Sequence, residues 1–237
     1  MAGQSIGESL SEVRAQVNLA CQKAGRHPDT VKIIAVTKKQ EIKKLREAYA
    51  LGLRCFAENY VQEALAKQAQ LVDLSGVSWH FIGHLQRNKV RQVVGAFAYI
   101  HSIDSLRLAQ AVSRIAQERG LRQKVLLEIN VGQETSKSGF APEDLSKILH
   151  PELAELPGLD LCGIMSFPPP SEDPELSRRY FRQTRVFLQS CQERLVNTRH
   201  ADTFCELSMG TSGDYFWAVV EGATMVRLGT TLLGHRQ

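Results

Sequence analysis

The stretch KVLLEINV, residues 124–131, is the clearest strand in the sequence, because apolar side chains occupy almost every position. A strand with one face in water would alternate polar and apolar residues along its length. A nearly unbroken apolar run instead predicts a strand covered on both faces, which is typical of parallel sheets flanked by helices. This segment therefore favours an α/β fold.

Outward from this stretch, short apolar or β-branched runs alternate with stretches of helical periodicity along the whole chain. We expect strands at residues 31–37, 54–57, 78–82, 98–102, 124–131, 159–166, 203–208 and 225–228. We expect helices between them at residues 41–51, 60–74, 87–94, 105–119, 141–156, 174–196 and 214–221. Eight strands joined by helical crossovers predict a single (β/α)8 TIM barrel, with a doubly wound open sheet as the alternative.

An extra helix precedes the first expected strand. Its apolar side chains recur every three or four residues, at Ile6, Leu10, Val13, Val17 and Cys21. Ser5 can cap its start and Gly25 can end it. We expect residues 1–30 to form a helical extension packed on the barrel, and residues 1–237 to form a single domain, because the proline-rich stretch 168–170 lies between one strand and its helix.

Composition and charge exclude several classes of protein. The chain has 237 residues, of which 43% are hydrophobic and 23% charged, so it can bury a core without disulfides or a structural metal. A net charge of +4 is too small to indicate nucleic-acid binding. The five cysteines follow no pattern, and no apolar run approaches the roughly 18 residues of a membrane span. We expect a cytoplasmic protein without membrane or nucleic-acid partners.

A metal site is not expected either. His80 and His84 are four residues apart, but Gly83 ends a strand between them and no HExxH pattern is present. These histidines, and His101 in a later strand, are expected to be packing or loop-tethering residues. The absence of GxGxxG and P-loop patterns disfavours dinucleotide binding and nucleotide hydrolysis.

Polar residues gather where the expected strands end, which is where barrels of this kind place their active sites. Reading along the chain, these residues are Lys38, Glu58, Asn59, Gly83, His84, Asp104, Asn130, Ser166, Ser208, Gly229 and Thr230. Lys38 leaves an apolar strand, so a partly desolvated amine there could attack a carbonyl carbon. The alternative is a solvated patch with Lys39, Lys43 and Lys44, and strand alternation does not decide which of Lys38 and Lys39 points inward.

Two glycine and hydroxyl corners follow the last two strands, SMGTSG at 208–213 and RLGTT at 227–231. Either corner alone would be read as an ordinary turn. Together they predict a phosphate site, because hydroxyls and exposed backbone N–H groups bind phosphate and barrels often place one after strands seven and eight. A lysine facing a phosphate site is the layout that pyridoxal 5′-phosphate (PLP) requires.

Five segments, in order, closely resemble the pyridoxal phosphate homeostasis protein family, whose fold is that of the alanine racemase N-terminal barrel. They are AVTK at 35–38, FAENYVQE at 56–63, WHFIGHLQRNK at 79–89, ELSMG at 206–210 and VRLGT at 226–230, and the resemblance covers essentially the whole chain. Thr37 stands where many members have serine, and Ala57 where many have glycine.

The resemblance assigns roles to individual residues. It implies that Lys38 holds PLP as an internal aldimine, a Schiff base, with Asn59 near the ring and Arg227 near the pyridine nitrogen. The remaining roles concern the phosphate and the pocket wall: Ser208, Gly229 and Thr230 bind the phosphate, Gly210 shapes that corner, and Ser166 lines the pocket.

The same resemblance implies a protein of vitamin B6 and amino-acid homeostasis that holds PLP without substantial catalysis. An arginine beside the pyridine nitrogen keeps the ring a poor electron sink, and the second catalytic domain of related racemases is not expected here. A monomer is favoured, with PLP-dependent apoenzymes as candidate recipients of the cofactor. The alternatives are a weak PLP-dependent enzyme of the amino-acid racemase type with Lys38 as sole base, and a lyase that forms a Schiff base with a sugar phosphate.

Overall fold

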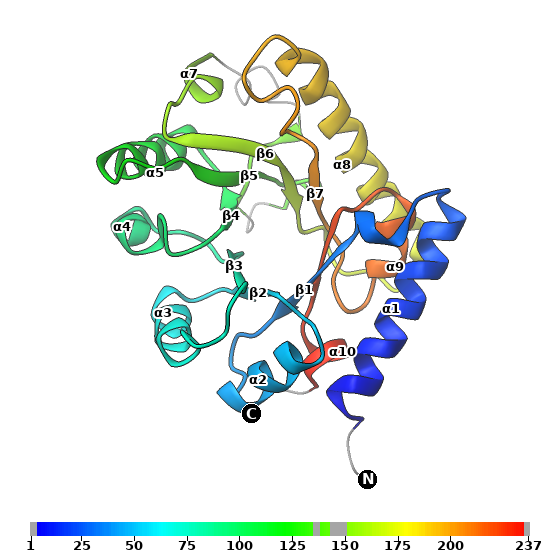
Figure 1. Ribbon diagram of the computed structural model, residues 1–237. Coiled ribbons are helices and arrows are strands. Elements are labelled where there is room, and N and C mark those ends of the chain that lie inside the picture. The colour runs from blue at the N-terminus through cyan, green and yellow to red at the C-terminus, as the bar shows by residue number, and fades with distance from the viewer. Residues whose placement is uncertain (1–3, 135–137, 143–150, 235–237) are drawn as a thin grey trace.

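The computed structural model describes residues 4–134, 138–142 and 151–234, and its centre is a closed barrel of parallel strands (Figure 1). The strands are β1 (Lys32–Val36), β2 (Cys55–Glu58), β3 (Ser78–Phe81), β4 (Tyr99–Ile103), β5 (Gln123–Ile129), β6 (Leu159–Ser166), β7 (Glu206–Ser208) and β8 (Met225–Leu228). They follow one another in sequence order, and β8 pairs with β1 through Ile34 and Arg227. The predicted (β/α)8 barrel is confirmed, and the open sheet is excluded by this last pairing.

Helices surround the barrel on its outside (Figure 1). They are α1 (Ile6–Lys23), α2 (Ile42–Ala50), α3 (Val61–Gln70), α4 (Val90–Val93), α5 (Leu106–Glu118), α7 (Pro151–Ala154), α8 (Pro174–Leu195), α9 (Tyr215–Val220) and α10 (Thr230–Leu233), with short 3-10 helices η1 (Pro28–Thr30) and η2 (Arg87–Lys89). None of the helices that the structure describes is both long and apolar enough to cross a membrane.

Several element boundaries differ from the prediction. The expected helix at 87–94 is divided into η2 and α4, and the expected strand at 203–208 begins only at Glu206 because Phe204 N–H bonds back to the His200 carbonyl (2.9 Å) in a turn. The helices η1 and α10 were not predicted. Of the helix expected at 141–156, α7 lies within the described residues, and residues 143–150 lie outside them.

Burial on both faces explains the apolar strands. Their outward side chains join a large core with the surrounding helices, and a smaller buried cluster forms inside the barrel. That inner cluster consists of Ile34, Val36, Ala57, Leu126, Cys162, Met165 and Met225. The apolar stretch at residues 124–131 contributes to both clusters, since Leu126 belongs to the cluster inside the barrel and Leu127 to the large core outside it.

Helix α1 packs against α9 and α10 beside the barrel (Figure 1). Ser5 and Glu8 form a capping box at its start, because Ser5 Oγ accepts from Glu8 N–H (3.3 Å) and Ser5 N–H donates to Glu8 Oε2 (2.9 Å). Val13 and Ala20 are fully buried. The predicted N-terminal helix therefore begins at its expected cap and covers the two short helices that follow β7 and β8.

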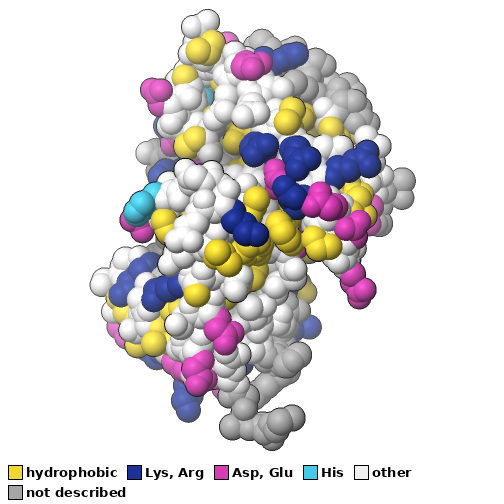
Figure 2. Space-filling model, turned by 90° about the vertical axis from the view of Figure 1, so that its right-hand side faces the viewer, with side chains coloured by type: hydrophobic (Ala, Val, Ile, Leu, Met, Phe, Trp, Pro, Cys, Tyr) yellow, Lys and Arg dark blue, Asp and Glu magenta, His cyan; other side chains and the backbone are white. Residues whose placement is uncertain are grey.

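Basic side chains of α8 anchor the end of α9. Glu221, only 3% exposed, pairs with Arg178 Nε (3.1 Å), Arg182 Nη2 (3.1 Å) and Arg185 Nη2 (3.7 Å). Figure 2 shows the side of the molecule that lies at the right in Figure 1. In its upper half, Lys and Arg side chains gather beside acidic and hydrophobic ones. These pairs fix α9, and with it the loop that joins β7 to α9, against the longest helix of the molecule.

Candidate functional site

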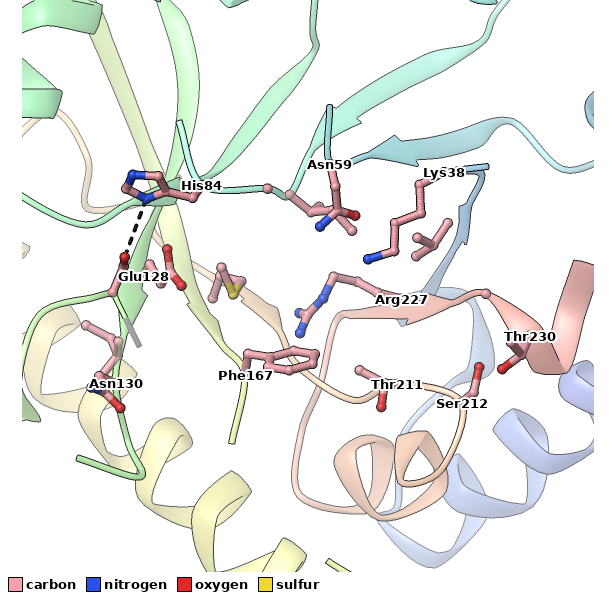
Figure 3. A pocket seen from close by; sticks show the side chains of 17 residues that line it. Lys38, Asn59, His84, Glu128, Asn130, Phe167, Thr211, Ser212, Arg227 and Thr230 are labelled. Carbon is pink, nitrogen blue, oxygen red and sulfur yellow. Dashed lines mark hydrogen bonds between the residues drawn. The ribbon is translucent and has the colours of Figure 1, made fainter. Parts of the chain in front are cut away.

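A cavity of about 600 Å³ opens at the carboxyl ends of the strands (Figure 3). Its volume lies within the usual range for small-molecule sites. It is lined by Val36, Lys38, Asn59, Ile82, Gly83, His84, Glu128, Ile129, Asn130, Ser138, Met165, Phe167, Thr211, Ser212, Arg227, Gly229 and Thr230. Most of the polar strand-end residues singled out from the sequence line this cavity, whereas Glu58, Asp104, Ser166 and Ser208 do not. Of the predicted site, the lining residues are Lys38, Asn59, Arg227, Gly229 and Thr230.

Lys38 sits in a tight turn directly after β1. Gln40 N–H donates to the Thr37 carbonyl across this turn (3.0 Å), and Lys39 adopts a left-handed conformation with φ of +57°. The Lys38 side chain points into the cavity in Figure 3, whereas Lys39 does not line it. The choice between the two lysines, which alternation left open, is resolved in favour of Lys38.

Two hydroxyl-bearing corners form the cavity wall near Lys38, one from the loop after β7 and one from the end of β8 (Figure 3). Thr231 joins them, since its N–H donates to Ser212 Oγ (3.3 Å) and its hydroxyl donates to the Ser212 carbonyl (3.3 Å). Asp214 holds the first corner by accepting from Thr211 N–H (2.6 Å). Thr211, Ser212, Gly229 and Thr230 thus present hydroxyl and backbone groups suited to an anion such as phosphate.

Gly210 lies behind the first corner and does not line the cavity. Its φ is +90°, and a Cβ added there would lie 2.5 Å from the Cβ of Ala218 in α9. Its carbonyl accepts the Arg227 backbone N–H (3.0 Å). Only glycine combines this backbone conformation with so close an approach of α9, so Gly210 sets where Thr211 and Ser212 can lie.

Arg227 supplies a cation at the centre of the cavity, although its side chain is only 4% exposed. Its Nη1 donates to Ser208 Oγ (2.7 Å) and its Nη2 donates to the Ser166 carbonyl (2.9 Å). Burial lowers the pKa of the guanidinium to about 10, so it remains protonated at neutral pH. The arginine is therefore fixed in orientation by two bonds.

Ser166 and Ser208 are the two predicted site residues besides Gly210 that do not line the cavity. Both are fully buried, one layer below its wall. Ser208 was expected to bind phosphate, but its Oγ bonds to Arg227 and lies 3.0 Å from His101 Nδ1. Their contacts indicate that these serines orient Arg227, and the hydroxyls that face the cavity are those of Thr211, Ser212 and Thr230.

A chain of neutral groups continues from Ser208 into the barrel. His101 Nε2 lies 2.9 Å from His80 Nδ1, and His80 Nε2 lies 3.1 Å from Ser78 Oγ. Burial lowers the pKa of His80 to about 3 and that of His101 well below its ordinary value, so both rings are neutral. Because Arg227 can only donate, the Ser208 hydroxyl oxygen accepts from it and also contacts His101 Nδ1. The histidines thus act as packing residues that complete this chain without adding charge.

Asn59 contributes an unsatisfied polar atom to the cavity wall. Its Oδ1 is buried and has no hydrogen-bond partner among the described residues. A Cβ on Gly83 would lie 2.2 Å from the Asn59 carbonyl oxygen, so the ends of β2 and β3 can approach this closely only with glycine. A buried polar atom without a partner is costly in a folded protein, and a bound ligand would remove this cost.

The far side of the cavity contains residues for which sequence reasoning proposed no site role. His84 is exposed at the rim, with Nδ1 3.4 Å from Asp104 Oδ2 and 3.4 Å from Ser138 Oγ. Burial, together with Asp104, raises the pKa of Glu128 to about 7. Position at a strand end had already marked His84 and Asn130, but Glu128 within its apolar run and Phe167 carried no signal of a site.

The donor set fits a phosphorylated aromatic aldehyde. An amine, a hydroxyl-rich anion corner, a central guanidinium and an unsatisfied amide oxygen all border one cavity. Within the part of the chain that the structure describes, no group of three or more His, Cys, Asp or Glu side chains is arranged to hold a metal ion.

Comparisons with known proteins place this site in context. A family model described as "Alanine racemase, N-terminal domain" matches residues 9–237. The pyridoxal phosphate homeostasis protein of Pseudomonas aeruginosa is 44% identical over 235 residues, which are 98% of this chain and 96% of that protein. The protein of the same name from Escherichia coli K12 is 37% identical over 233 residues, covering 98% of this chain and 97% of that protein.

Solved structures agree with these matches. PipY of Synechococcus elongatus PCC7942, solved with PLP bound, superposes with a TM-score of 0.84 at 40% identity, and the match covers 97% of this chain and 100% of that one. An alanine racemase of Clostridium difficile is 19% identical with a TM-score of 0.66, covering 95% of this chain and 57% of that one. The second likeness concerns the fold alone.

Proposed function

The chain belongs to the family of pyridoxal phosphate homeostasis proteins, and on that basis we propose that it binds PLP on Lys38 and serves vitamin B6 and amino-acid homeostasis without substantial catalysis. One observation carries the proposal. The Lys38 amine and a hydroxyl-rich anion corner face the same cavity, which is large enough for the cofactor (Figure 3). The PLP bound to PipY, a solved relative at 40% identity, supports the same reading.

Lys38 would form the covalent link. When bound, PLP supplies an aldehyde carbon that a neutral primary amine can attack, forming a Schiff base and releasing one water molecule. Val36, Ile82 and Met165 line the cavity with Lys38 and give it an apolar wall beside the amine.

The hydroxyl corner would hold the phosphate, and Arg227 the ring nitrogen. Thr211, Ser212 and Thr230 offer hydroxyls, and Gly229 offers a backbone that an anion can approach closely. Arg227 stays protonated at neutral pH, and it donates hydrogen bonds without giving up its proton. A pyridine nitrogen facing such a group is not protonated, so the ring withdraws electrons poorly. This arrangement supports storage of the cofactor over turnover.

Exposure of the cavity rim supports exchange of the cofactor with other proteins. Phe167 is 51% exposed, and the His84 side chain is 61% exposed. An amine from solvent or from a PLP-dependent apoenzyme could therefore reach the link at Lys38. We propose such apoenzymes as recipients, a monomeric carrier, and a cytoplasmic location, which fits the five unpaired cysteines.

A weak PLP-dependent enzyme of the amino-acid racemase type is the second candidate function. It is favoured by Glu128, a titratable carboxyl group that lines the cavity together with Lys38. Robust racemisation or transamination by the purified protein, lost in Lys38→Ala, would establish this alternative and overturn the proposal of a carrier without turnover.

An absorbance spectrum tests the link to Lys38. The purified protein, loaded with PLP, should show a band between about 300 and 500 nm that borohydride fixes to the peptide containing Lys38. Lys38→Ala should lack this band, whereas Lys39→Ala, the adjacent lysine that does not line the cavity, should retain it. A wild-type protein that stays colourless after incubation with PLP would refute the proposed function.

A further inference from the structure

The turn that carries Lys38 is held in an unfavourable backbone conformation. Lys39 has a φ of +57°, a left-handed value that a residue with a Cβ rarely adopts. Glycine would occupy such a position without strain. Strain of this kind persists only where surrounding contacts enforce it, and it is concentrated at functional sites.

Three charged side chains next to this turn form a buried ion cluster, which we call the Lys67 cluster. It consists of Glu58 at the end of β2 and of Glu63 and Lys67 on α3. Lys67 Nζ lies 2.7 Å from Glu58 Oε1 and 2.7 Å from Glu63 Oε1. The side chains of Glu58, Lys67 and Glu63 are 0%, 8% and 25% exposed.

The cluster bonds to the residues on both sides of Lys38. Lys67 Nζ donates to the Thr37 carbonyl (2.5 Å), and Thr37 Oγ1 donates to Glu58 Oε1 (2.7 Å). On the other side, the Lys39 backbone N–H donates to Glu63 Oε1 (2.5 Å). The backbone immediately before and after Lys38 is thus tied to one rigid set of charges.

Stability alone does not account for this cluster. Glu58 Oε2 is buried without a hydrogen-bond partner among the described residues, and burial raises the pKa of Glu58 despite its bond to Lys67. Replacing buried ion pairs by packed apolar side chains is often neutral or stabilising. The buried carboxylate of Glu58 is energetically costly, and the cluster that contains it contacts the turn that presents Lys38 to the cavity. This location indicates that the cluster positions Lys38.

We infer that Glu63 and Lys67 are positioning residues that hold the Lys38 turn so that the amine meets the cofactor aldehyde at the attack geometry. The inference rests on the proposed function, because it concerns formation of the same covalent link. Glu63 acts through the Lys39 N–H and Lys67 through the Thr37 carbonyl, and neither lines the cavity.

Glu63 provides the test, because it is partly exposed and its loss leaves the Lys67–Glu58 pair in place. In Glu63→Ala, the rate of bond formation with PLP, followed by absorbance after rapid mixing, should fall by about tenfold, since small displacements of a reacting group are costly. Affinity for pyridoxine 5′-phosphate, which has the ring and phosphate but no aldehyde, should be unchanged. Glu63→Gln keeps an acceptor oxygen for Lys39 N–H and should react at close to the wild-type rate.

Two further variants separate positioning from general damage. Adding Lys39→Gly to Glu63→Ala should restore most of the rate, because glycine adopts the left-handed turn without support. Asp160→Ala removes the partner of Arg122 (2.5 Å) elsewhere on the barrel and should leave the rate unchanged. An unaltered rate in Glu63→Ala, no recovery with Lys39→Gly, or an equal loss of pyridoxine 5′-phosphate binding would overturn the inference. Failure of the wild-type protein to link PLP to Lys38 would instead refute the proposed function.

Discussion

At the scale of single residues, Arg227 and Glu128 lie in the same cavity but differ in how their surroundings shift the pKa. Arg227 has two neutral partners, Ser208 and the Ser166 carbonyl, and keeps its charge. Glu128 lines the same cavity, and burial together with the nearby Asp104 raises the pKa of its carboxyl to about 7. The attraction of Arg227 only partly offsets this rise. The Glu128 carboxyl therefore changes its protonation near neutral pH.

We predict that Glu128 makes the apoprotein less stable as the pH rises from about 5 to 8. Its pKa is about 7 in the folded protein against an ordinary value of 4.5, so in this window the folded state binds more protons than the unfolded state. The free energy of unfolding therefore falls with rising pH, by roughly 1–3 kcal/mol from this group. Glu128→Gln should match the wild type at pH 5 and exceed its stability at pH 8 by that amount, measured by urea unfolding. Parallel pH profiles of the two proteins would contradict this.

Position at a strand end is the signal by which sequence indicates residues near the cavity. Lys38, Asn59, Gly229 and Thr230 were singled out because they follow strands, and all four line the cavity, although their roles there stay predictions. Sequence spacing does not reveal depth, however, so the position of Ser208 one layer below the wall could not be foreseen. The contact that defines its position comes from Arg227 on the neighbouring strand β8, whose Nη1 donates to Ser208 Oγ.

At the scale of elements, the loop between β7 and α9 positions the anion corner. Gly210 lets α9 approach, Asp214 fixes Thr211, and Thr231 ties Ser212 to the end of β8. The Asp214 contact lies within the loop itself, and the Gly210 contact joins the loop to the helix that follows it. The Thr231 contact comes from the end of β8, so the corner depends both on the loop sequence and on the packing of β8 against it.

Gly210→Ala should disrupt this corner. A methyl group would lie 2.5 Å from the Ala218 Cβ at a φ of +90°, so we expect a loss of about 2–4 kcal/mol in the free energy of unfolding and weaker binding of inorganic phosphate. Gly213 in the same loop is the matched control, since a Cβ there would meet no atom within 4 Å. Gly213→Ala should change stability by less than about 0.5 kcal/mol. Equal effects of the two substitutions would argue against the close approach of α9 as the cause.

The order and type of the strands could be predicted because short apolar or β-branched runs, such as β5 and β6, alternate with segments of helical periodicity. Boundaries were less accurate where hydrogen bonds between neighbouring turns decide them. At residues 87–94, Lys89 N–H bonds to the Gln86 carbonyl (2.9 Å) in 3-10 geometry, which separates η2 from α4. The four-residue helix α10 is too short to show a helical period in the sequence.

At the scale of the whole molecule, the barrel and α1 share one continuous core. Leu10 on α1 is 2% exposed and belongs to the same buried cluster as residues of the strands and outer helices. We therefore propose that residues 1–237 unfold as a single domain. The two tryptophans report on separate regions, because Trp79 lies on β3 and Trp217 on α9.

Leu10→Ala should lower the free energy of unfolding by about 2–4 kcal/mol, because it leaves a cavity between α1 and the barrel. Tryptophan fluorescence and far-ultraviolet circular dichroism should report the same single transition in urea. Leu19→Ala, on the same helix but 44% exposed, should change stability by less than about 0.5 kcal/mol. A separate early transition for α1 in Leu10→Ala would show that the helix folds independently of the barrel.

The pairing of β8 with β1 also determines when during synthesis the cavity can exist. Lys38 follows the first strand, whereas Arg227 and Thr230 are made almost two hundred residues later and complete the wall beside it. A nascent chain on the ribosome has the lysine long before it has the anion corner. Under the proposed binding at Lys38, the complete cavity is available to the cofactor only after release of the last strand, so we expect the barrel to form as an apoprotein.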